Sequence, residues 1–440
     1  MKRRRRRIRR AQRGLRVVVT RPPDHWFYGL AHQYAALYAQ SLRDLGAVVL
    51  AVPVEPFVAQ DGAAVRDVVD EIRRFGPDLA MGLHEAGYAL YCRAASTPEQ
   101  APTNVFVDWL ELPTILLWDH ALLQFAPILL GDLPDHPDDS VDGCLSLLRA
   151  ELSHPLYVHV ARDSGHRETA HALGVVPRDR VLLEPSFAHP HLSDGHGRPP
   201  TRHADVAFFG HLRPLELESR PARHHAALVE LREAVLRGKV DRLETPVLQD
   251  VVAAVDELPA YLRASMRLHP DESFYWSILC SEMAVAQTWL RRALLEGLGR
   301  ELAFYGDYGE REAGGRVDWR PARFRFGPEL AAAFAGAAVT VDLVNPGFLH
   351  GYGTKVMNCF AADGFMLLDR KQDFVELFGE LGEAVSFSSL GELQAKLDYY
   401  LSNEDERRAI AEALRERIRE HHSLPGLLRR VTEAALGLRT

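Results

Sequence analysis

The sequence predicts an α/β protein built from two doubly wound domains that face each other across a cleft. Short, continuous apolar runs alternate with amphipathic segments, a pattern typical of parallel strands covered by helices on both faces. The length of 440 residues is enough for two domains of ordinary size. A polar stretch rich in His, Gly and Pro divides the chain, and we interpret residues 188–204 as the linker between the domains.

The N-terminal domain is expected to span residues 15–187. Its predicted strands are 15–20, 47–54, 78–84, 114–120, 156–162 and 178–186. Its predicted helices are 28–45, 65–76, 86–95 and 141–152. The strands are rich in Val, Leu and Ile and the helices place apolar residues at helical spacing, so the pattern predicts a parallel sheet between helical layers.

The C-terminal domain is expected to span residues 205–440. Its predicted strands are 205–210, 301–309, 317–321, 339–344, 365–368 and 384–389. Residues 216–300 are predicted to be a mostly helical insertion, and two long helices, 390–401 and 405–421, are predicted to close the chain. Two domains of similar plan imply a cleft between them, which is where ligands of such proteins bind.

The charge is unevenly distributed. The net charge is −8, although residues 2–16 hold ten Lys or Arg residues and no acid. The remaining chain is therefore strongly acidic and a poor surface for sequence-specific binding of nucleic acid. The basic arm, residues 1–14, is expected to be disordered; the alternative is a contact with an anionic membrane surface or RNA.

The apolar runs and the cysteines argue against a membrane-spanning protein, a secreted protein and a cysteine-based metal site. No apolar run approaches the roughly 20 residues that span a bilayer, and no apolar signal segment follows the basic arm. We therefore expect a cytoplasmic protein. The four cysteines are far apart and form no metal-binding spacing, so we expect neutral thiols and no metal site. They are Cys92, Cys144, Cys280 and Cys359.

The most informative stretch is VDLVNPGFLHGYGTKVMNCFAADGFMLLD, residues 341–369. A predicted strand runs into a loop with three glycines, and a helix is predicted to begin near Thr354. Glycines let a backbone approach a ligand closely, and a helix start offers unpaired N–H groups with a partial positive charge. Lys355 adds a full charge, so the combination suits a diphosphate. The alternative is an ordinary strand–loop–helix connection whose glycines only turn the chain.

Several residues of this stretch have two interpretations. An ammonium near a helix N-terminus is electrostatically unfavourable unless an anion joins it, so we expect Lys355 to bind phosphate rather than cap the helix. Backbone access favours Gly351 and Gly353 as ligand-binding positions. Asn358 either contacts a ribose or is a buried structural amide, and Tyr352 either stacks on a ligand or packs in the core.

Polar residues and glycines also follow several predicted strands. Because the carboxyl ends of parallel strands share one edge of a sheet, these residues are expected to face the cleft. They are His84, Asp119, His120, Gly210, His211, Gly306 and Asp307. A His or Asp at that edge is suited to remove a hydroxyl proton, so His84, Asp119 and His120 are candidate general bases. The alternative is that they cap turns.

Longer motifs in the C-terminal half occur in a specific order. They are KVMN at 355–358, LLD at 367–369, DFVELFGELGEAVSF at 373–387, LQAKLDYYLSNEDERRAIAEA at 393–413 and EHHS at 420–423. In this order and nearly all of this spacing, residues 336–440 resemble the C-terminal half of GT-B glycosyltransferases, in particular the CgeB-like group. DVAFFGHL at 205–212 resembles the opening strand of that domain, and LPTILLWDH at 112–120 is similar to a strand end of the N-terminal half. We cannot place residues 216–300 in the family pattern.

The resemblance implies the GT-B fold and a metal-independent glycosyltransferase of the hexosyltransferase type. Such an enzyme moves a sugar from a nucleoside diphosphate sugar, its co-substrate, to an acceptor that is unknown here, without a further cofactor. The acceptor would dock on the N-terminal domain near His84, Asp119 and His120. The resemblance places the donor at Gly210, His211, Gly306, Asp307, His350, Gly351, Tyr352, Gly353, Thr354, Lys355 and Asn358.

Three positions depart from the family pattern. Many retaining GT-B enzymes carry two acids eight residues apart around this loop, where this chain has His350 and Asn358. Lys355 replaces the family's Arg, which keeps the charge but loses the bidentate geometry. Either the donor differs or the protein is an inactive relative that serves as a binding or scaffold protein. A nucleotide-sugar epimerase shares the fold and is a further alternative.

Overall fold

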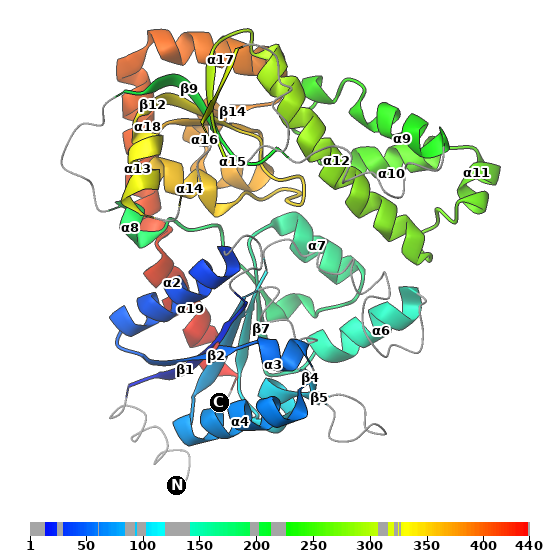
Figure 1. The fold of residues 1–440 in the computed structure, drawn as a ribbon, viewed down its shortest axis with the longest axis vertical. Coiled ribbons are helices and arrows are strands. Elements are labelled where there is room, and N and C mark those ends of the chain that lie inside the picture. The colour runs from blue at the N-terminus through cyan, green and yellow to red at the C-terminus, as the bar shows by residue number, and fades with distance from the viewer. Residues whose placement is uncertain are drawn as a thin grey trace.

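The computed structural model describes residues 14–23, 30–59, 61–83, 93–94, 103–118, 141–193, 202–212, 226–306, 316–320, 324 and 327–438. These residues form two lobes stacked along the long axis of the molecule (Figure 1). A six-stranded sheet lies at the centre of each lobe, and every strand pair in both sheets is parallel. The predicted α/β class with two doubly wound halves is confirmed.

The first sheet has the strand order β2-β1-β3-β6-β7-β8. The strands are β1 (Arg16–Arg21), β2 (Val48–Pro53), β3 (Leu79–Leu83), β6 (Thr114–Leu117), β7 (Tyr157–Ala161) and β8 (Val181–Leu183). A 3₁₀ turn, η3 (Arg178–Arg180), leads into β8. Each strand lies within a range that the sequence predicts. The chain passes from β1 to β2 and then crosses to the other side of β1, so the strand order reverses between β1 and β3.

Alternate side chains of β1 enter different cores because successive residues of a strand point to opposite faces. Val17 and Val19 pack with α2 (Leu30–Asp44), whereas Val18 packs with α4 (Gly62–Phe75) and Phe57 of α3 (Glu55–Val58). Helices α6 (Val141–Leu152) and α7 (Ser164–Ala172) cover the part of the sheet near β7. The continuous apolar runs of the sequence thus reflect burial on both faces.

The second sheet has the strand order β11-β10-β9-β12-β13-β14. The strands are β9 (Ala204–Phe209), β10 (Leu302–Tyr305), β11 (Val317–Arg320), β12 (Ala337–Asp342), β13 (Met366–Asp369) and β14 (Ser386–Phe387). The order reverses between β9 and β12. The helices that follow or cover these strands are α13 (Pro328–Ala335), α14 (Thr354–Ala361), α15 (Gln372–Phe378), α16 (Glu380–Val385), α17 (Leu390–Ser402) and α18 (Glu404–His421).

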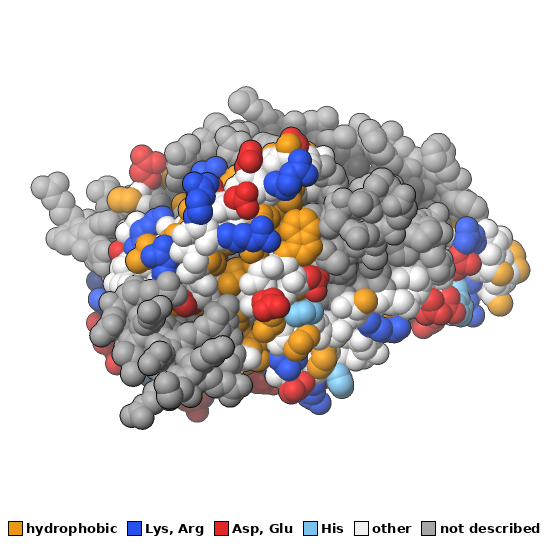
Figure 2. All heavy atoms as spheres, turned by 90° about the horizontal axis from the view of Figure 1, so that it is seen from below, with side chains coloured by type: hydrophobic (Ala, Val, Ile, Leu, Met, Phe, Trp, Pro, Cys, Tyr) orange, Lys and Arg blue, Asp and Glu red, His pale blue; other side chains and the backbone are white. Residues whose placement is uncertain are grey.

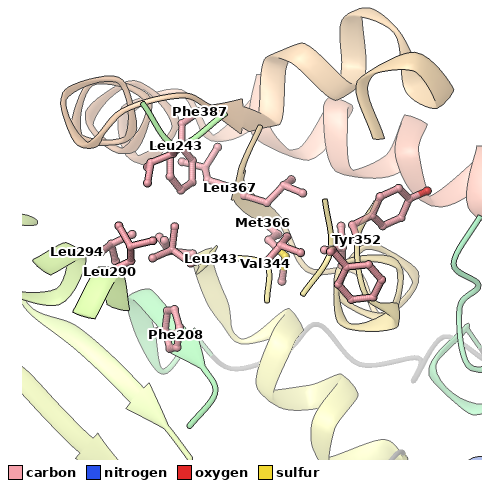
Figure 3. Close-up of a cluster of buried hydrophobic side chains, with 14 of the residues drawn as sticks. Phe208, Leu243, Leu290, Leu294, Leu343, Val344, Tyr352, Met366, Leu367 and Phe387 are labelled. Carbon is pink, nitrogen blue, oxygen red and sulfur yellow. The ribbon is translucent and has the colours of Figure 1, made fainter. Parts of the chain in front are cut away.

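Residues 226–297 form the predicted helical insertion, which extends to one side of the second lobe (Figure 1). Its helices are α9 (Ala226–Leu236), α10 (Val247–Glu257), α11 (Ala260–Ser265) and α12 (Ser273–Gly297), with a short 3₁₀ turn η6 (Lys239–Asp241). Arg232 of α9 donates to both carboxylate oxygens of the buried Glu282 of α12, at 2.8 and 2.7 Å. Leu290 and Leu294 of α12 point into the core of the second sheet (Figure 3), so the insertion is anchored to the lobe.

The last helix, α19 (Leu424–Gly437), corrects the predicted domain boundary. The sequence analysis assigned residues 205–440 to the C-terminal domain, but α19 returns to the first lobe. Leu424, Leu428 and Val431 are fully buried in one core with β1, α2 and β7. Arg430 also binds both oxygens of Glu184, at 2.6 to 3.1 Å. The amphipathic pattern of α19 predicts a helix but not the sheet that it covers.

Two smaller expectations also change. The prediction of a helix at 86–95 is wrong at its end, because β4 (Arg93–Ala94) pairs antiparallel with β5 (Thr103–Asn104); residues 84–92 lie outside the described residues. A π-helical turn, η2 (Val105–Trp109), follows β5, and the Asn104 side chain accepts from its first N–H groups. The linker begins with a short helix, α8 (Pro190–Ser193). Local sequence patterns do not reveal that residues 93–94 pair with residues further along the chain. This explains why the sequence predicted a helix there.

The basic arm, residues 1–13, lies outside the described residues. Figure 2 views the molecule from the end formed by the first lobe, where Lys and Arg side chains are interspersed with Asp and Glu around a small group of hydrophobic side chains. Among the described helices, none combines the length and the apolar character needed to cross a membrane.

We predict that His159 makes stability depend on pH. His159 is fully buried; its Nδ1 accepts from Trp118 Nε1 at 3.2 Å, so its Nε2–H donates to the Leu152 carbonyl at 2.8 Å. Burial lowers the pKa of His159 from 6.5 to about 4. The unfolded chain takes up this proton near pH 6.5, so the stabilisation is complete above pH 6.5. It is lost as the pH falls towards 4, by about 3 kcal/mol.

The measurement is the free energy of unfolding between pH 7 and 4 for the wild type and His159→Gln. The variant should lose part of the pH slope, while His422, whose pKa burial also lowers to about 4, keeps its own contribution. His171→Gln, at an exposed position, is the control and should leave the slope unchanged. If the free energy of unfolding of His159→Gln depends on pH as steeply as that of the wild type, His159 is not the group responsible.

We also predict that α19 stabilises the first lobe. Leu428→Ala removes a fully buried side chain from the core around β1 and α2 and should cost about 2–5 kcal/mol. Hydrogen exchange of the β1 and β7 amides would detect the loss. Leu183→Ala, at a position that is 38% exposed, should have a much smaller effect; equal losses would show that α19 is not specifically required.

Candidate functional site

The carboxyl ends of β7 and β12 meet at the interface between the lobes. The glycine-containing loop after β12, residues 343–353, lies against the turn that connects β7 to α7. In doubly wound sheets, ligands bind outside the carboxyl ends of the strands, next to the point where the strand order reverses. The loop therefore faces the partner lobe, as the sequence analysis expected.

The anion that binds this loop belongs to the protein. The carboxylate of Asp163, which follows β7, accepts from the backbone N–H groups of Leu349 at 2.7 Å, Gly351 at 2.9 Å and His350 at 3.2 and 3.3 Å. It also accepts from the His166 N–H at 3.1 Å, which caps α7. The Asp163 side chain is completely buried. Three consecutive N–H groups that suit an anion are thus occupied by a carboxylate from the other lobe.

The loop therefore binds an anion, which in this structure is the carboxylate of Asp163 from the partner lobe. Burial alone would raise the pKa of Asp163, but His166 and the N–H groups of Gly351, His166 and His350 outweigh it and lower the pKa below its usual value of 3.8. The carboxylate is therefore charged at neutral pH. A buried charge of this kind is tolerated because it is fully hydrogen-bonded.

Gly351 is required by the contact between the lobes. A Cβ atom at this position would lie 2.7 Å from the Arg162 carbonyl oxygen and 2.9 Å from the Cα atom of Asp163. Any side chain would therefore push the loop away from the β7–α7 turn. Gly353 has no such neighbour, since its nearest contact would be Phe348 at 3.6 Å.

His350 takes part in a polar cluster that joins the lobes. Its Nδ1 lies 3.2 Å from Ser164 Oγ, and Ser164 donates to Asp373 through Oγ at 2.6 Å and through its backbone N–H at 2.8 Å. The Asp373 N–H in turn donates to the His350 carbonyl at 3.0 Å. Burial raises the pKa of Asp373, although the bonds from Ser164 oppose this. His350 therefore contacts the partner lobe through Ser164.

Tyr352 and Thr354 also lie at the interface. Tyr352 is fully buried and packs edge-on against Phe374 with ring centroids 5.0 Å apart, so it belongs to the core. Its carbonyl accepts from Ser186 Oγ at 2.5 Å. Thr354 forms a hydrogen bond with the hydroxyl of Tyr34 on α2. Both residues hold the lobes together in this structure.

Lys355 bridges the two strands between which the order of the second sheet reverses. Its ammonium forms an ion pair with Asp342, the last residue of β12, and donates to the carbonyl of Phe209, the last residue of β9, at 2.8 Å. It also lies 5.5 Å from the centre of the Phe208 ring. Burial lowers the pKa of Lys355, and Asp342 opposes this. The anion that the helix start requires is thus supplied by Asp342.

Other residues join Lys355 at this edge, and we call Lys355, Asp342, Arg291, His211 and Gly306 the switch-point cluster. Arg291 of α12 donates to the His211 carbonyl at 2.7 Å and is close enough for its charge to lower the pKa of Lys355. Gly306 has a φ of +151°, and a Cβ atom there would lie 1.7 Å from the Gly210 carbonyl. The structure therefore brings together the predicted Gly210, His211, Gly306 and Lys355.

Asn358 is a buried structural amide in this structure. Its Oδ1 accepts from the His189 N–H at 2.7 Å, and the residue is only 1% exposed. It thereby ties α14 to the start of the linker. Of the two interpretations that the sequence left open, this contact favours the structural one.

Four candidate residues lie outside the described residues: His84, Asp119, His120 and Asp307. Asp163, Asp342 and Arg291 were not selected from the sequence. Asp342 and Asp163 stand at or just after strand ends, so the criterion that selected Asp119 would have found both. Arg291 lies in the insertion and carries no sequence signal of this kind.

Groups of three or more His, Cys, Asp and Glu side chains placed to hold a metal ion are absent from the described part of the chain. Cys359, a free cysteine, is completely buried next to Gly364. Burial raises the pKa of its thiol, so it is protonated at neutral pH. Cys359 therefore behaves as a core residue.

Comparison with known proteins identifies the second lobe. Residues 287–431 match the protein family described as "Glycosyl transferase-like". A search of curated protein sequences gives no match. Among solved structures, a glycosyltransferase from Rickettsia africae is similar at 9% identity, with a TM-score of 0.53 over 97% of this chain and 99% of the other. The β-glucosyltransferase of T4 phage is also similar, at 9% identity, a TM-score of 0.46, and 96% and 99% coverage.

These findings define the fold, which is GT-B, and show a glycosyltransferase-like region in the chain. Its C-terminal half contains the glycosyltransferase-like domain, as the resemblance of residues 336–440 to the CgeB-like group implied. The match begins at 287, within α12, so the C-terminal part of the last helix of the insertion belongs to the matched region.

We predict that Asp163 holds the lobes in the closed arrangement. Asp163→Asn removes the charge, and an amide has only one oxygen to accept from three loop N–H groups. The closed form should lose about 2–3 kcal/mol. Small-angle scattering should show a larger radius of gyration at pH 7 than for the wild type, and the melting temperature should fall.

Asp179→Asn, at an exposed position, serves as the control and should change neither quantity. The pKa of Asp163 is lowered in the folded protein, so its stabilisation is present above pH 3.8 and is lost as the pH falls through the lower, folded value. If Asp163→Asn and Asp179→Asn have the same radius of gyration at pH 7, Asp163 does not hold the lobes closed.

Proposed function

We propose that the protein is a metal-independent hexosyltransferase that moves a sugar from a nucleoside diphosphate sugar to a hydroxyl acceptor. The observation that carries the proposal is the position of Lys355 and Arg291 at the strand reversal of the domain that matches the glycosyltransferase family. Two cations at this edge are suited to bind a diphosphate and to stabilise the charge that develops on the leaving nucleotide.

The donor is proposed to bind when the lobes separate. In the closed structure Asp163 occupies the N–H groups of residues 349–351, and Lys355 is paired with Asp342. A diphosphate carries more charge than one carboxylate, and it competes with Asp163 for the same donors. The donor-binding residues proposed are Gly210, His211, Gly306, Asp307, His350, Gly351, Gly353, Thr354 and Lys355.

Closure of the lobes over the donor would exclude water, which otherwise competes with the acceptor. Gly351 supports this step, because its lack of a side chain allows the loop to approach Arg162 and Asp163. We propose His120, Asp119 or His84 as the base that accepts the acceptor's proton. In the sequence, His84 directly follows β3, and Asp119 and His120 follow β6 after one intervening residue.

A binding or scaffold protein is the second candidate function. It is favoured by the same Asp163 contact, because a loop that permanently binds its own carboxylate has no place for a phosphate. The structural role of Asn358 also favours it. The two candidates differ in whether a ligand can displace Asp163.

The experiment is to incubate the protein with UDP, GDP, dTDP and their glucose conjugates, and to follow both thermal stability and release of nucleoside diphosphate. For the transferase we expect one nucleotide to raise the melting temperature by mass action and its sugar conjugate to be hydrolysed slowly. Lys355→Ala should weaken nucleotide binding by roughly tenfold or more, because a charge-assisted contact is lost.

Lys396→Ala is the matched control, since Lys396 lies on α17 and pairs with Glu392 outside the switch-point cluster. It should bind the nucleotide as the wild type does. Parallel assays with EDTA and with added magnesium or manganese test whether a metal is needed. If no nucleotide stabilises the protein, or Asp163→Asn does not strengthen nucleotide binding, the transferase proposal fails and the scaffold candidate remains.

A further inference from the structure

Lysine is rare in this protein and gathers at one edge of the second sheet. The chain has five lysines among 52 basic residues. Three of them, Lys239, Lys355 and Lys371, lie at the carboxyl ends of β9, β12 and β13 or against them. A lysine provides a compact ammonium where an arginine provides a planar fork. Lys355 belongs to the switch-point cluster, and the other two lysines line a separate pocket.

This pocket, which we call the lysine pocket, lies between the insertion and the second sheet. Its polar side chains come from Lys239, Thr245, Gln287, Asp369 and Lys371. Its apolar wall is made by Leu243, Val247, Leu290, Leu343, Val344 and Pro346. Figure 3 shows Leu243, Leu290, Leu343 and Val344 converging from the insertion and from the end of β12. The pocket therefore exists only because the insertion covers this edge of the sheet.

Some polar side chains of the lysine pocket have all their hydrogen-bond donors paired, and others do not. The Lys239 ammonium is saturated, since it pairs with Asp250 at 2.6 Å and donates to the carbonyls of Arg242 and Thr245. Within the part of the chain that the structure describes, the Lys371 ammonium has one partner, Asp369, at 3.1 Å. In the same part the Gln287 amide makes no hydrogen bond. Lys371 and Gln287 therefore retain donors that a ligand can use.

The spare donors of the lining favour an anion. Two ammoniums line the pocket; Asp250 pairs with Lys239, and Asp369, one oxygen of which already accepts from the Val344 N–H at 2.6 Å, pairs with Lys371. The two ammoniums line the same pocket, and burial, followed by the charge of Lys371, lowers the pKa of Lys239. Lys371 is 6% exposed and Lys239 1%, so these charges are poorly screened by water.

The size of the pocket limits the ligand. Its volume is about 370 Å³, which includes space that is open to the solvent. The enclosed part accommodates a group of a few atoms and not a whole sugar ring. Charge, donors and size together describe a site for one oxyanionic group, a carboxylate or a phosphate.

We propose that the lysine pocket binds a single small oxyanion, a carboxylate or phosphate, through Lys371 and Gln287 with Lys239 behind them. The pocket adjoins the switch-point cluster, because Leu343 and Val344 of its lining directly follow Asp342 in the chain. A nucleoside diphosphate sugar with a carboxylate on its sugar could therefore reach both sites. The inference that the anion is part of the sugar donor rests on the proposed function. Binding of free phosphate does not depend on that function.

The first experiment uses inorganic phosphate as the probe. The melting temperature of the full chain is measured in increasing sodium phosphate, with sodium chloride at the same ionic strength as reference. We expect phosphate to stabilise the wild type, and Lys371→Met and Gln287→Leu to bind it roughly tenfold more weakly. Lys371→Arg should retain part of the effect, and the matched control Lys396→Met should retain all of it.

The second experiment compares UDP-glucuronate with UDP-glucose as donors. If the anion is part of the donor, the wild type consumes UDP-glucuronate faster, and Lys371→Met removes this preference. If phosphate binds as expected but UDP-glucose is consumed as fast as UDP-glucuronate, the anion is not part of the donor. The pocket is then a site for a free anion. If phosphate and acetate give no stabilisation beyond chloride, or Lys396→Met loses as much as Lys371→Met, the lysine pocket is not an oxyanion site.

Discussion

The closed arrangement of the protein depends on one buried carboxylate. Asp163 of the first lobe accepts from three consecutive backbone N–H groups of the second, and its charge is stabilised by these bonds and by His166. The contact leaves no room for a side chain at residue 351, and it sets the loop against the β7–α7 turn. The surrounding polar contacts of Ser164, His350 and Thr354 all require that the loop is held in this position.

The same principle recurs at the switch-point cluster and the lysine pocket. Each ammonium there has an acid from its own chain: Asp342 for Lys355, Asp369 for Lys371 and Asp250 for Lys239. Such pairing makes buried ammoniums tolerable in a low-dielectric environment. It also means that an incoming anion must compete with an acid that is already present, so binding is coupled to rearrangement of ion pairs or of the lobes.

Much of the fold could be predicted from the sequence because it depends on local patterns. The strands of both sheets are continuous apolar runs, and the start of α14 at Thr354 follows from the glycine loop. The partners of individual side chains could not be predicted in this way. Lys355 was identified as a residue that requires an anion, but whether that anion is a phosphate or Asp342 depends on the packing of β9 against β12. Asp163 follows a strand end and could have been selected as a candidate, but its contact with the loop after β12 depends on how the lobes pack. Arg291 reaches its position through tertiary contacts that no sequence spacing reveals.

The return of α19 to the first lobe has a consequence for biosynthesis. The chain crosses between the lobes a second time at Ser423, directly beside the first crossing, where Ala188 bridges to Ser423 and its N–H donates to the His422 carbonyl at 3.1 Å. The α2 side of the first sheet is completed only by Leu424, Leu428 and Val431. During translation this half is made first, yet its hydrophobic face stays uncovered until the ribosome has released the final helix. The N-terminal half thus reaches its native core after the C-terminal half has been synthesised.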